Sequence, residues 1–349
     1  MPSRSSSDSP VAASRWLRAA VGLALAGLAL LTGAQQLVQR ELWWLELSRY
    51  VPYPALLALG VAALLASMWL GWRWVAASTV TLAGLAVFAM GFVWGHADRG
   101  GKPLRLMTYN IKAYNAAVRA GGFEALAREV AAQRPDVLLV QDNQLVSRAD
   151  AARLWNNGRV FGFEHVFAVD QYLIASRYPL LECGPRNGES ARRPYTHARC
   201  RIDVDGVLLN LVTTHFESPR VGLNAARREG FDGLDDWRRN VDERLAQART
   251  LAIDLAGVAR PLVVAGDLNA PETSPVIGTL LRSGLRDAFS SAGRGYGYSY
   301  GHALRVGVSF LRIDHVLVSP EIGVATSFVG ASEASDHRPV IADLLLPPR

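Results

Sequence analysis

The sequence predicts an α/β domain of roughly 250 residues, long enough to bury a sizeable core, that follows a membrane segment. Residues 16–94 are dominated by Ala, Leu, Val and Gly and carry few charges. From Gly101 onward, short apolar runs typical of buried strands alternate with helical spacing and with Pro and Gly. At 349 residues the chain exceeds the usual size of one domain, so we expect two structural units.

Three apolar runs, at residues 16–32, 52–70 and 74–94, approach the roughly 20 residues that a spanning helix needs, and their only charged residue is Arg18 near the start of the first. Tryptophans cluster near their ends, as they do at membrane interfaces. A cleaved signal peptide would also explain the first run, but two further runs favour a retained helix. We expect a cytoplasmic tail at residues 1–15 and a three-helix anchor in the lipid bilayer at residues 16–96.

Basic residues before the first run and in the turn at Arg73 indicate an anchor in the inner (cytoplasmic) membrane with the C-terminal domain outside the cytoplasm. These residues are opposed by a second basic group on the other side of the runs, Arg40, Arg49, Arg99, Lys102 and Arg105. The runs contain no ionisable residue of the kind that marks a transport path, so an anchor is favoured over a transporter.

The later part of the chain reads as an alternation of strands and helices. Pro135 ends one helix, and Asp205-Gly206 is a hairpin turn between two strands. The patterns predict strands at residues 103–109, 136–140, 173–176, 198–204, 207–213, 261–265, 313–318 and 340–345, and helices at 123–133 and 240–256.

Polar residues lie at or beside the ends of these strands. Each one alone is explained by an ordinary turn or surface loop, but rigid strand ends are also where convergent functional groups are placed. The full set indicates one site, and its members are Asn110, Asp142, His215, Asp267, Asn269, Asp314, Asp336 and His337.

Seven short motifs carry a family resemblance: Thr108-Tyr109-Asn110, Val140-Gln141-Asp142, Ser176-Arg177-Tyr178-Pro179, Thr214-His215, Gly266-Asp267-Leu268-Asn269, Ile313-Asp314-His315 and Ser335-Asp336-His337. In this order the chain resembles the endonuclease/exonuclease/phosphatase family from Leu104 to Leu345. The resemblance implies that residues 103–349 form a four-layer α/β sandwich, two packed mixed β-sheets between helices, with a site at one edge. It also implies a phosphoesterase that depends on Mg²⁺ or Mn²⁺.

The resemblance assigns metal binding to oxygen ligands on Asn110, Asp142 and Asp336, which suit a hard cation acting as a Lewis acid. The family usually has Glu where this chain has Asp142. The shorter side chain would hold the metal through water, hold it more weakly, or select a larger ion. Tyr172 also departs from the family, because many members have Asn at that position.

The remaining site residues are catalytic by resemblance. Asp267 would position or deprotonate the attacking water, with Asn269 holding it. His337 would contact the phosphoryl group while Asp314 fixes its tautomer. His215 would donate to the phosphate or to the leaving group, and the competing interpretation for it is a core histidine.

The expected function is hydrolysis of phosphate esters by a membrane-anchored nuclease, phosphodiesterase or phosphatase. The alternative is a membrane-tethered binding protein of the same fold that has lost turnover. Nucleic acid, a phospholipid head group and a small phosphate ester remain open as substrates, with residues 217–237 expected to shape the substrate rim. The net charge of +6 comes almost wholly from arginine, for which codon usage is a simpler explanation than phosphate binding.

The two cysteines, Cys183 and Cys200, match no metal-binding spacing. They lie on two expected neighbouring strands, so they are either one disulfide or two buried thiols. A disulfide would require an oxidising compartment, which an extracytoplasmic domain would occupy.

Overall fold

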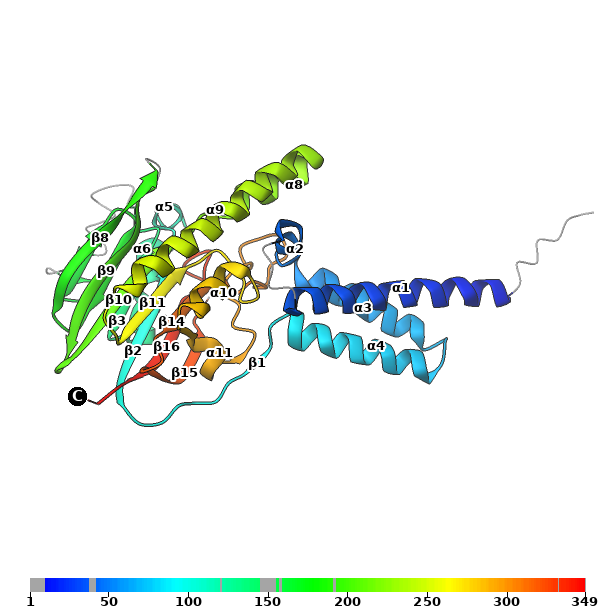
Figure 1. Cartoon of the computed structure of the whole chain (residues 1–349), viewed down its shortest axis with the longest axis horizontal. Helices are drawn as coiled ribbons and strands as arrows, with labels where there is room; N and C mark the ends of the chain where they lie inside the picture. The colour runs from blue at the N-terminus through cyan, green and yellow to red at the C-terminus, as the bar shows by residue number, and fades with distance from the viewer. Residues whose placement is uncertain are drawn as a thin grey trace, which may run out of the picture. The chain divides into compact units, whose positions relative to one another are not determined.

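The computed structural model describes residues 10–37, 42–119, 121–144, 155–156, 159–190, 193–331 and 333–348. The chain divides into two compact units, Met1–Phe92 and Val93–Arg349 (Figure 1). Of the predicted tail at residues 1–15, the first nine lie outside the described residues, and the first helix already begins at Pro10.

The first unit is helical. Its elements are α1 (Pro10–Leu37), α2 (Trp43–Ser48), α3 (Tyr53–Ser67), α4 (Trp72–Gly84) and the π-helix η1 (Leu85–Ala89). In α2 the buried side chains of Glu46 and Arg49 form an ion pair of 3.1 Å, and Arg49 also donates to the carbonyl of Gln35 in α1. Because Arg49 is buried and paired inside this unit, it says little about which side of a membrane this part of the chain would face.

The expectation of three spanning helices needs correction. Among the described residues, two stretches are long and apolar enough to cross a membrane, Arg15–Leu37 and Trp72–Ala89. The middle run forms α3, which has only 15 residues and spans about 22 Å against a hydrocarbon core of about 30 Å. The helix stops there because the chain turns at Gly71, which has a φ of 102°. The last run also ends early, since Val93 and Trp94 form a strand.

Two six-stranded mixed sheets build the second unit. The first has the order β12 (Arg286–Asp287), β14 (Asp314–Val318), β11 (Leu262–Asp267), β10 (Val207–His215), β9 (Arg193–Val204) and β8 (Leu180–Ser190). The second has the order β15 (Gly323–Val329), β16 (Val340–Leu346), β2 (Lys102–Asn110), β3 (Val137–Gln141), β7 (Tyr172–Ser176) and β6 (His165–Val169). The pairs β10–β11 and β2–β3 are parallel, and the other pairs in these sheets are antiparallel.

Among the described residues, two small sheets and six helices complete this unit. The small sheets pair β1 (Val93–Trp94) with β13 (Arg294–Gly295), and β4 (Trp155–Asn156) with β5 (Arg159–Val160). The helices are α5 (Ala113–Ala116), α6 (Gly122–Gln133), α8 (Arg220–Glu229), α9 (Phe231–Ala256), α10 (Pro275–Arg282) and α11 (Ala288–Ala292).

The sheets pack face to face, and helices cover their outer faces. One apolar cluster joins Leu106 and Leu139 of the second sheet to Leu209 and Val263 of the first. A second cluster places α6 on the outer face of the second sheet, and Figure 1 shows α9 and α10 over the first sheet. This arrangement confirms the predicted fold of two packed mixed sheets with helices.

Every predicted strand is present, and the turn at Asp205-Gly206 has the two positive φ angles, 49° and 93°, of a tight hairpin. The helix expected at residues 240–256 begins earlier, at Phe231, and α8 precedes it. α8 and the first two turns of α9 lie in residues 217–237, the stretch that the sequence analysis expected to shape the substrate rim. Charged residues are frequent in both helices, but α8 is clearly amphipathic, so its helical spacing was present in the sequence and was not recognised.

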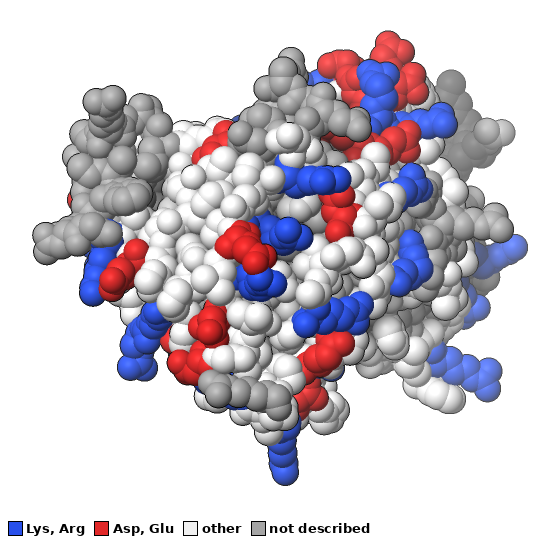
Figure 2. All heavy atoms as spheres, turned by 60° about the vertical axis from the view of Figure 1, so that its left-hand side comes forward, with Lys and Arg blue, Asp and Glu red and all other residues white. Residues whose placement is uncertain are grey.

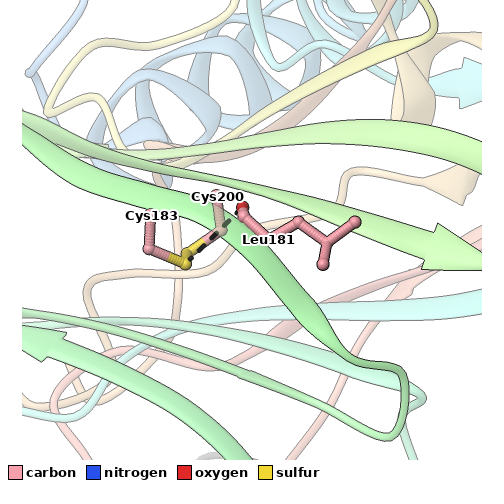
Figure 3. The surroundings of a disulfide bond; sticks show 3 residues. All are labelled: Leu181, Cys183 and Cys200. Atoms are coloured by element: carbon pink, nitrogen blue, oxygen red, sulfur yellow. Dashed lines mark hydrogen bonds between the residues drawn. A yellow bond between two sulfur atoms is a disulfide. The ribbon is translucent and has the colours of Figure 1, made fainter.

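The cysteines form one disulfide, Cys183–Cys200, between the adjacent strands β8 and β9 (Figure 3). Cys200 is fully buried in the core between the sheets, and Cys183 packs against the same core. Of the two alternatives that the sequence left open, the structure therefore has the bonded pair.

Basic and acidic side chains are interspersed on the face of the molecule that Figure 2 shows. The net positive charge is therefore not gathered into a single continuous track on this face. A uniformly basic stripe is the electrostatic footprint expected of a protein that binds long nucleic acids through their phosphates.

His197 on β9 gives a testable pH dependence of stability. Burial lowers the pKa of this histidine to about 4, from an ordinary 6.5. The unfolded chain therefore binds a proton that the folded chain resists, and stability should fall as the pH drops from 6.5 to 4. We expect about 2–3 kcal/mol of acid destabilisation from this residue, since one pKa unit corresponds to about 1.4 kcal/mol. Urea midpoints at pH 7.5 and 4.5 should differ less in His197→Gln than in the wild type, and equal differences would refute this role.

Candidate functional site

Three of the predicted site residues lie in one row across the first sheet. His215 pairs with Asp267 in the parallel ladder of β10 and β11, and Asp267 pairs with Asp314 on β14. In the second sheet Asn110 pairs with Gln141 at the ends of β2 and β3. The carboxyl ends of both parallel pairs therefore carry site residues.

Gly266 allows strands β10 and β11 to approach each other closely within this row. Its φ is 154°, and a Cβ atom at this position would lie 1.9 Å from the backbone oxygen of Thr214. Only glycine fits such an approach of β11 to β10. The neighbouring Asp267 is consequently held beside His215, which follows Thr214.

Asp267 is the centre of the site and is almost completely buried. Its Oδ2 atom accepts a hydrogen bond of 3.0 Å from Nδ2 of Asn110, and it lies 3.4 Å from Nε2 of His215 and 3.7 Å from Nε2 of His337. Its Oδ1 atom accepts from the backbone N–H of Asn269 at 3.0 Å. Most of these residues are far apart in the sequence, and the fold brings them around the single carboxylate of Asp267.

His337 and Asp314 form the predicted pair. Nδ1 of His337 lies 2.9 Å from Oδ2 of Asp314, which leaves Nε2 directed toward Asp267. Burial alone would lower the pKa of His337, but the carboxylates of Asp314 and Asp267 outweigh burial and raise it. Tyr300 packs its ring against the imidazole, with centroids 4.9 Å apart. His337 is therefore positioned to act as a cation.

His215 is held from its other side by residues of the second sheet. Nδ1 lies 2.7 Å from Oε1 of Gln171 and 3.5 Å from Oδ1 of Asp142. Gln171 was not predicted, although it precedes Tyr172, the position noted as a departure from the family. The hydroxyl of Tyr172 donates instead to the carbonyl of Thr196, so Tyr172 serves the core between the sheets.

Asp142 makes a contact that the sequence did not predict. The ammonium group of Lys112 lies 2.8 Å from its Oδ2 atom. Burial would raise the pKa of the Asp142 carboxyl, but the charges of His215 and Lys112 together hold that pKa well below its usual range. The backbone N–H of Lys112 also donates to Oδ1 of Asn110. Lys112 thus links two of the three predicted metal ligands.

Asp336, the third predicted metal ligand, is paired with residues near α5. Its carboxylate accepts from Nδ2 of Asn115 at 2.8 Å and forms an ion pair with Arg119. The adjacent Ser335 donates to the backbone oxygen of Asn110, which places this loop beside Asn110.

Several buried polar residues support the site and were missed by the sequence reading. Gln141 donates from one sheet to the hydroxyl of Thr213 in the other and also to Thr108. Arg244 on α9 donates to the carbonyl of Asn269, while Nδ2 of Asn269 donates to the carbonyl of Phe216. Asn269 therefore supports Asp267 through its backbone N–H, with its own side chain fixed elsewhere.

The donors available here suit a hard divalent cation. The site combines the carboxylates of Asp142, Asp267 and Asp314 with the amide of Asn110, and Oδ1 of Asp314 is buried without a hydrogen-bond partner. Among the described residues, Asp267, Asp314 and His337 bring their ligand atoms within 4.8 Å of one another. Oxygen-rich donor sets of this type bind Mg²⁺ or Mn²⁺.

A family model described as the endonuclease/exonuclease/phosphatase family matches residues 107–337. This match covers well over half of the chain, and the chain belongs to this family. The members are enzymes that act on phosphoesters, so the protein is of the phosphoesterase class. A search of curated proteins found no match.

Solved structures of this fold resemble the chain at low sequence identity. A family protein from Bacteroides thetaiotaomicron has a TM-score of 0.52 and 15% identity, over 72% of this chain and 100% of the other. One from Bacteroides vulgatus has a TM-score of 0.52 and 18% identity, over 70% and 99%. D. rerio TDP2, solved with a single-strand DNA product, has a TM-score of 0.52 and 15% identity, over 70% and 99%. These likenesses establish the fold.

Proposed function

We propose that this protein is a membrane-anchored phosphoesterase that uses Mg²⁺ or Mn²⁺ and an activated water. The observation that carries the proposal is the Asp267 carboxylate, which lies among Asn110, His215 and His337 at the ends of both sheets. Phosphoester hydrolysis needs an oriented water, compensation of charge on the phosphoryl oxygens and protonation of the leaving oxygen.

Each requirement has a residue in the site. Asp267 orients the attacking water and accepts its proton as the new P–O bond forms. His337, kept cationic by Asp314, donates to a phosphoryl oxygen. His215 donates a proton to the phosphate or to the leaving oxygen as the old P–O bond breaks. Asn110 and the backbone of Asn269 keep the Asp267 carboxylate in place.

The residues that would hold the metal are Asn110, Asp142 and Asp336, as the resemblance implies. The metal would supply Lewis-acid polarisation of the phosphoryl group. Lys112 already neutralises part of the Asp142 charge, so metal binding must share this carboxylate with an ammonium group. Asp267, Asp314 and His337 form the alternative group of metal ligands. Mutation of Asp142 distinguishes these two candidate metal sites.

The test is hydrolysis of bis(p-nitrophenyl) phosphate and p-nitrophenyl phosphate by the full chain in detergent, with EDTA or added Mg²⁺ or Mn²⁺. We expect turnover only with metal. Asp142→Glu should lower the metal concentration needed for half-maximal rate, because the longer side chain lets the carboxylate reach the metal beyond Lys112. Asp142→Ala should raise that concentration about tenfold or more, because the carboxylate is lost. Lys112→Met should lower it, because the competing ammonium group is removed.

Identical metal titrations in all four proteins would assign the metal elsewhere, to the Asp314 set. A folded chain without turnover in any metal would favour the second candidate, a tethered binding protein in which the Lys112–Asp142 pair has replaced the metal.

The membrane anchor rests on the two long apolar helices. Only 22% and 17% of their most apolar windows are buried, so most of this apolar surface faces outward, unlike that of a core helix in a soluble protein. We infer that they span the inner membrane, with α3 completing the anchor without a span of standard length. The Cys183–Cys200 disulfide supports an extracytoplasmic catalytic domain, because such bonds persist in oxidising compartments.

Thiol labelling of denatured chain from intact cells, with and without reductant, tests this topology together with a reporter fused after Arg349. We expect labelling only after reduction and a reporter that is active outside the cytoplasm. Two freely labelled thiols with a cytoplasmic reporter would place the domain inside the cell.

A further inference from the structure

Three segments border the loop of Asp336 and His337, and together we call them the rim. They are residues 113–119, residues 220–224 and residues 303–308. Arg119 pairs with Asp336, and Arg220 donates to the hydroxyl of Tyr300, whose ring packs on His337. The third segment lies between His302, which contacts the backbone oxygen of Ser335, and Phe310, which donates to the carbonyl of Tyr300. The first segment therefore contacts a site residue directly, and the other two are held beside the site through Tyr300 and Ser335.

The rim exposes aliphatic side chains. Val118 is 86% exposed and Val221 is 68% exposed, although both are residues that usually lie in the core. Residues 303–308 are six consecutive exposed positions, and Leu304, Val306 and Val308 are the large apolar ones among them. Apolar side chains gathered at the mouth of a site indicate an interaction surface.

The charged residues within the three rim segments are all basic, although Arg119 is paired with the neighbouring carboxylate of Asp336. Each segment has one arginine, namely Arg119, Arg220 or Arg305, and none of the three contains Asp or Glu. Aliphatic residues mixed with arginine, without carboxylates, are typical of surfaces that enter the head-group region of anionic bilayers. Sites for single-stranded nucleic acid instead combine basic residues with several aromatic stacking platforms, whereas the three rim segments expose one aromatic side chain, Tyr114.

We propose that the rim binds the surface of an anionic phospholipid bilayer, and that the phosphoester hydrolysed in the site belongs to a lipid head group. This inference rests on the proposed function and narrows its substrate class. Val118, Val221 and the loop at residues 303–308 enter the interfacial layer, while Arg220 and Arg305 contact lipid phosphates. The head group then reaches Asp267 and His337 without leaving the membrane surface.

The disulfide makes a specific experiment possible, because Cys183 and Cys200 are bonded to each other and the chain has no other cysteine. Val306→Cys would be the only free thiol and can take an environment-sensitive fluorophore. The matched control is Leu208→Cys, which is similarly exposed but lies at the opposite end of β10 from His215. Both variants are made in the full chain and placed in lipid nanodiscs that contain phosphatidylglycerol.

We expect a nitroxide lipid to quench the probe at position 306 at least about twofold more than the probe at position 208, and the difference to shrink in pure phosphatidylcholine. Val221→Cys should behave like Val306→Cys. The double variant Leu304→Asp/Val306→Asp should lower the rate on phosphatidylglycerol relative to the rate on bis(p-nitrophenyl) phosphate about tenfold.

Equal quenching at positions 306 and 208, together with hydrolysis of the soluble ester, would overturn the lipid inference and leave the proposed function standing. Preferential hydrolysis of single-stranded DNA over lipid would also overturn it. Strong quenching at position 306 with no hydrolysis of any ester would instead support the membrane contact and reject the hydrolase.

Discussion

Replacing Asp267 by Ala is expected to lower kcat/KM for bis(p-nitrophenyl) phosphate on the order of 10²–10⁴-fold, the range for loss of a general base. The carboxylate accepts hydrogen bonds from Asn110 and from the backbone of Asn269, and it faces both site histidines. Asp267→Asn preserves the shape of the side chain but removes its charge and its basicity, so it should be almost as inactive. Steady-state kinetics with saturating metal would measure both losses.

Asp254→Asn is the matched control for Asp267. Asp254 lies on α9 and pairs at 3.0 Å with Arg186 of β8, which is two strands from β10 in the first sheet. This variant should retain turnover, with melting temperatures reporting that all three variants are folded. An active Asp267→Asn protein would show that the attacking water is activated by another group.

The second large effect is expected at His337 and Asp314, measured as a double-mutant cycle. His337→Ala should reduce kcat about 10²–10³-fold, as for removal of a group that stabilises charge in the transition state. Asp314→Asn should cost less, because it leaves the imidazole present but removes the carboxylate that orients it and raises its pKa. Since Asp314 acts through His337, the double variant should be no slower than His337→Ala alone.

Additive losses in this cycle would mean that Asp314 has a separate role, such as holding the metal through its unpartnered Oδ1 atom. Metal titration of Asp314→Asn distinguishes that role, because a ligand variant needs more metal and an orienting variant does not. His165→Ala serves as the histidine control, since His165 lies on the edge strand β6.

The strands and the residues at their ends could be predicted from the sequence because both are local properties. A buried run such as residues 261–265 followed by Gly-Asp-Leu-Asn specifies a strand and places Asp267 at its end. Asn110, His215 and Asp267 were expected together because rigid strand ends are where convergent functional groups are placed. Asp142 and Asp336 were also placed near that edge, although their partners were not foreseen.

The anchor shows where a local pattern is insufficient. Hydropathy alone cannot separate an apolar helix of 15 residues from a spanning one when turns flank it, so α3 was counted as a third span. The disulfide was left undecided for a related reason. The sequence placed both cysteines on neighbouring strands, but only the register of β8 against β9 brings their sulfur atoms together.

The sequence by itself determined the α/β class, the strand ends and the set of polar residues that those ends present. Only the tertiary structure decided which side chains of this set contact one another and which further residues hold them. Gln171 reaches His215 from another sheet, 44 positions away in the chain, and Gln141 crosses between the sheets to Thr213. Such contacts depend on how two sheets pack face to face, which no short pattern encodes. Lys112 meets Asp142 through pairing within one sheet, because the ends of β2 and β3 lie side by side only after that sheet has formed.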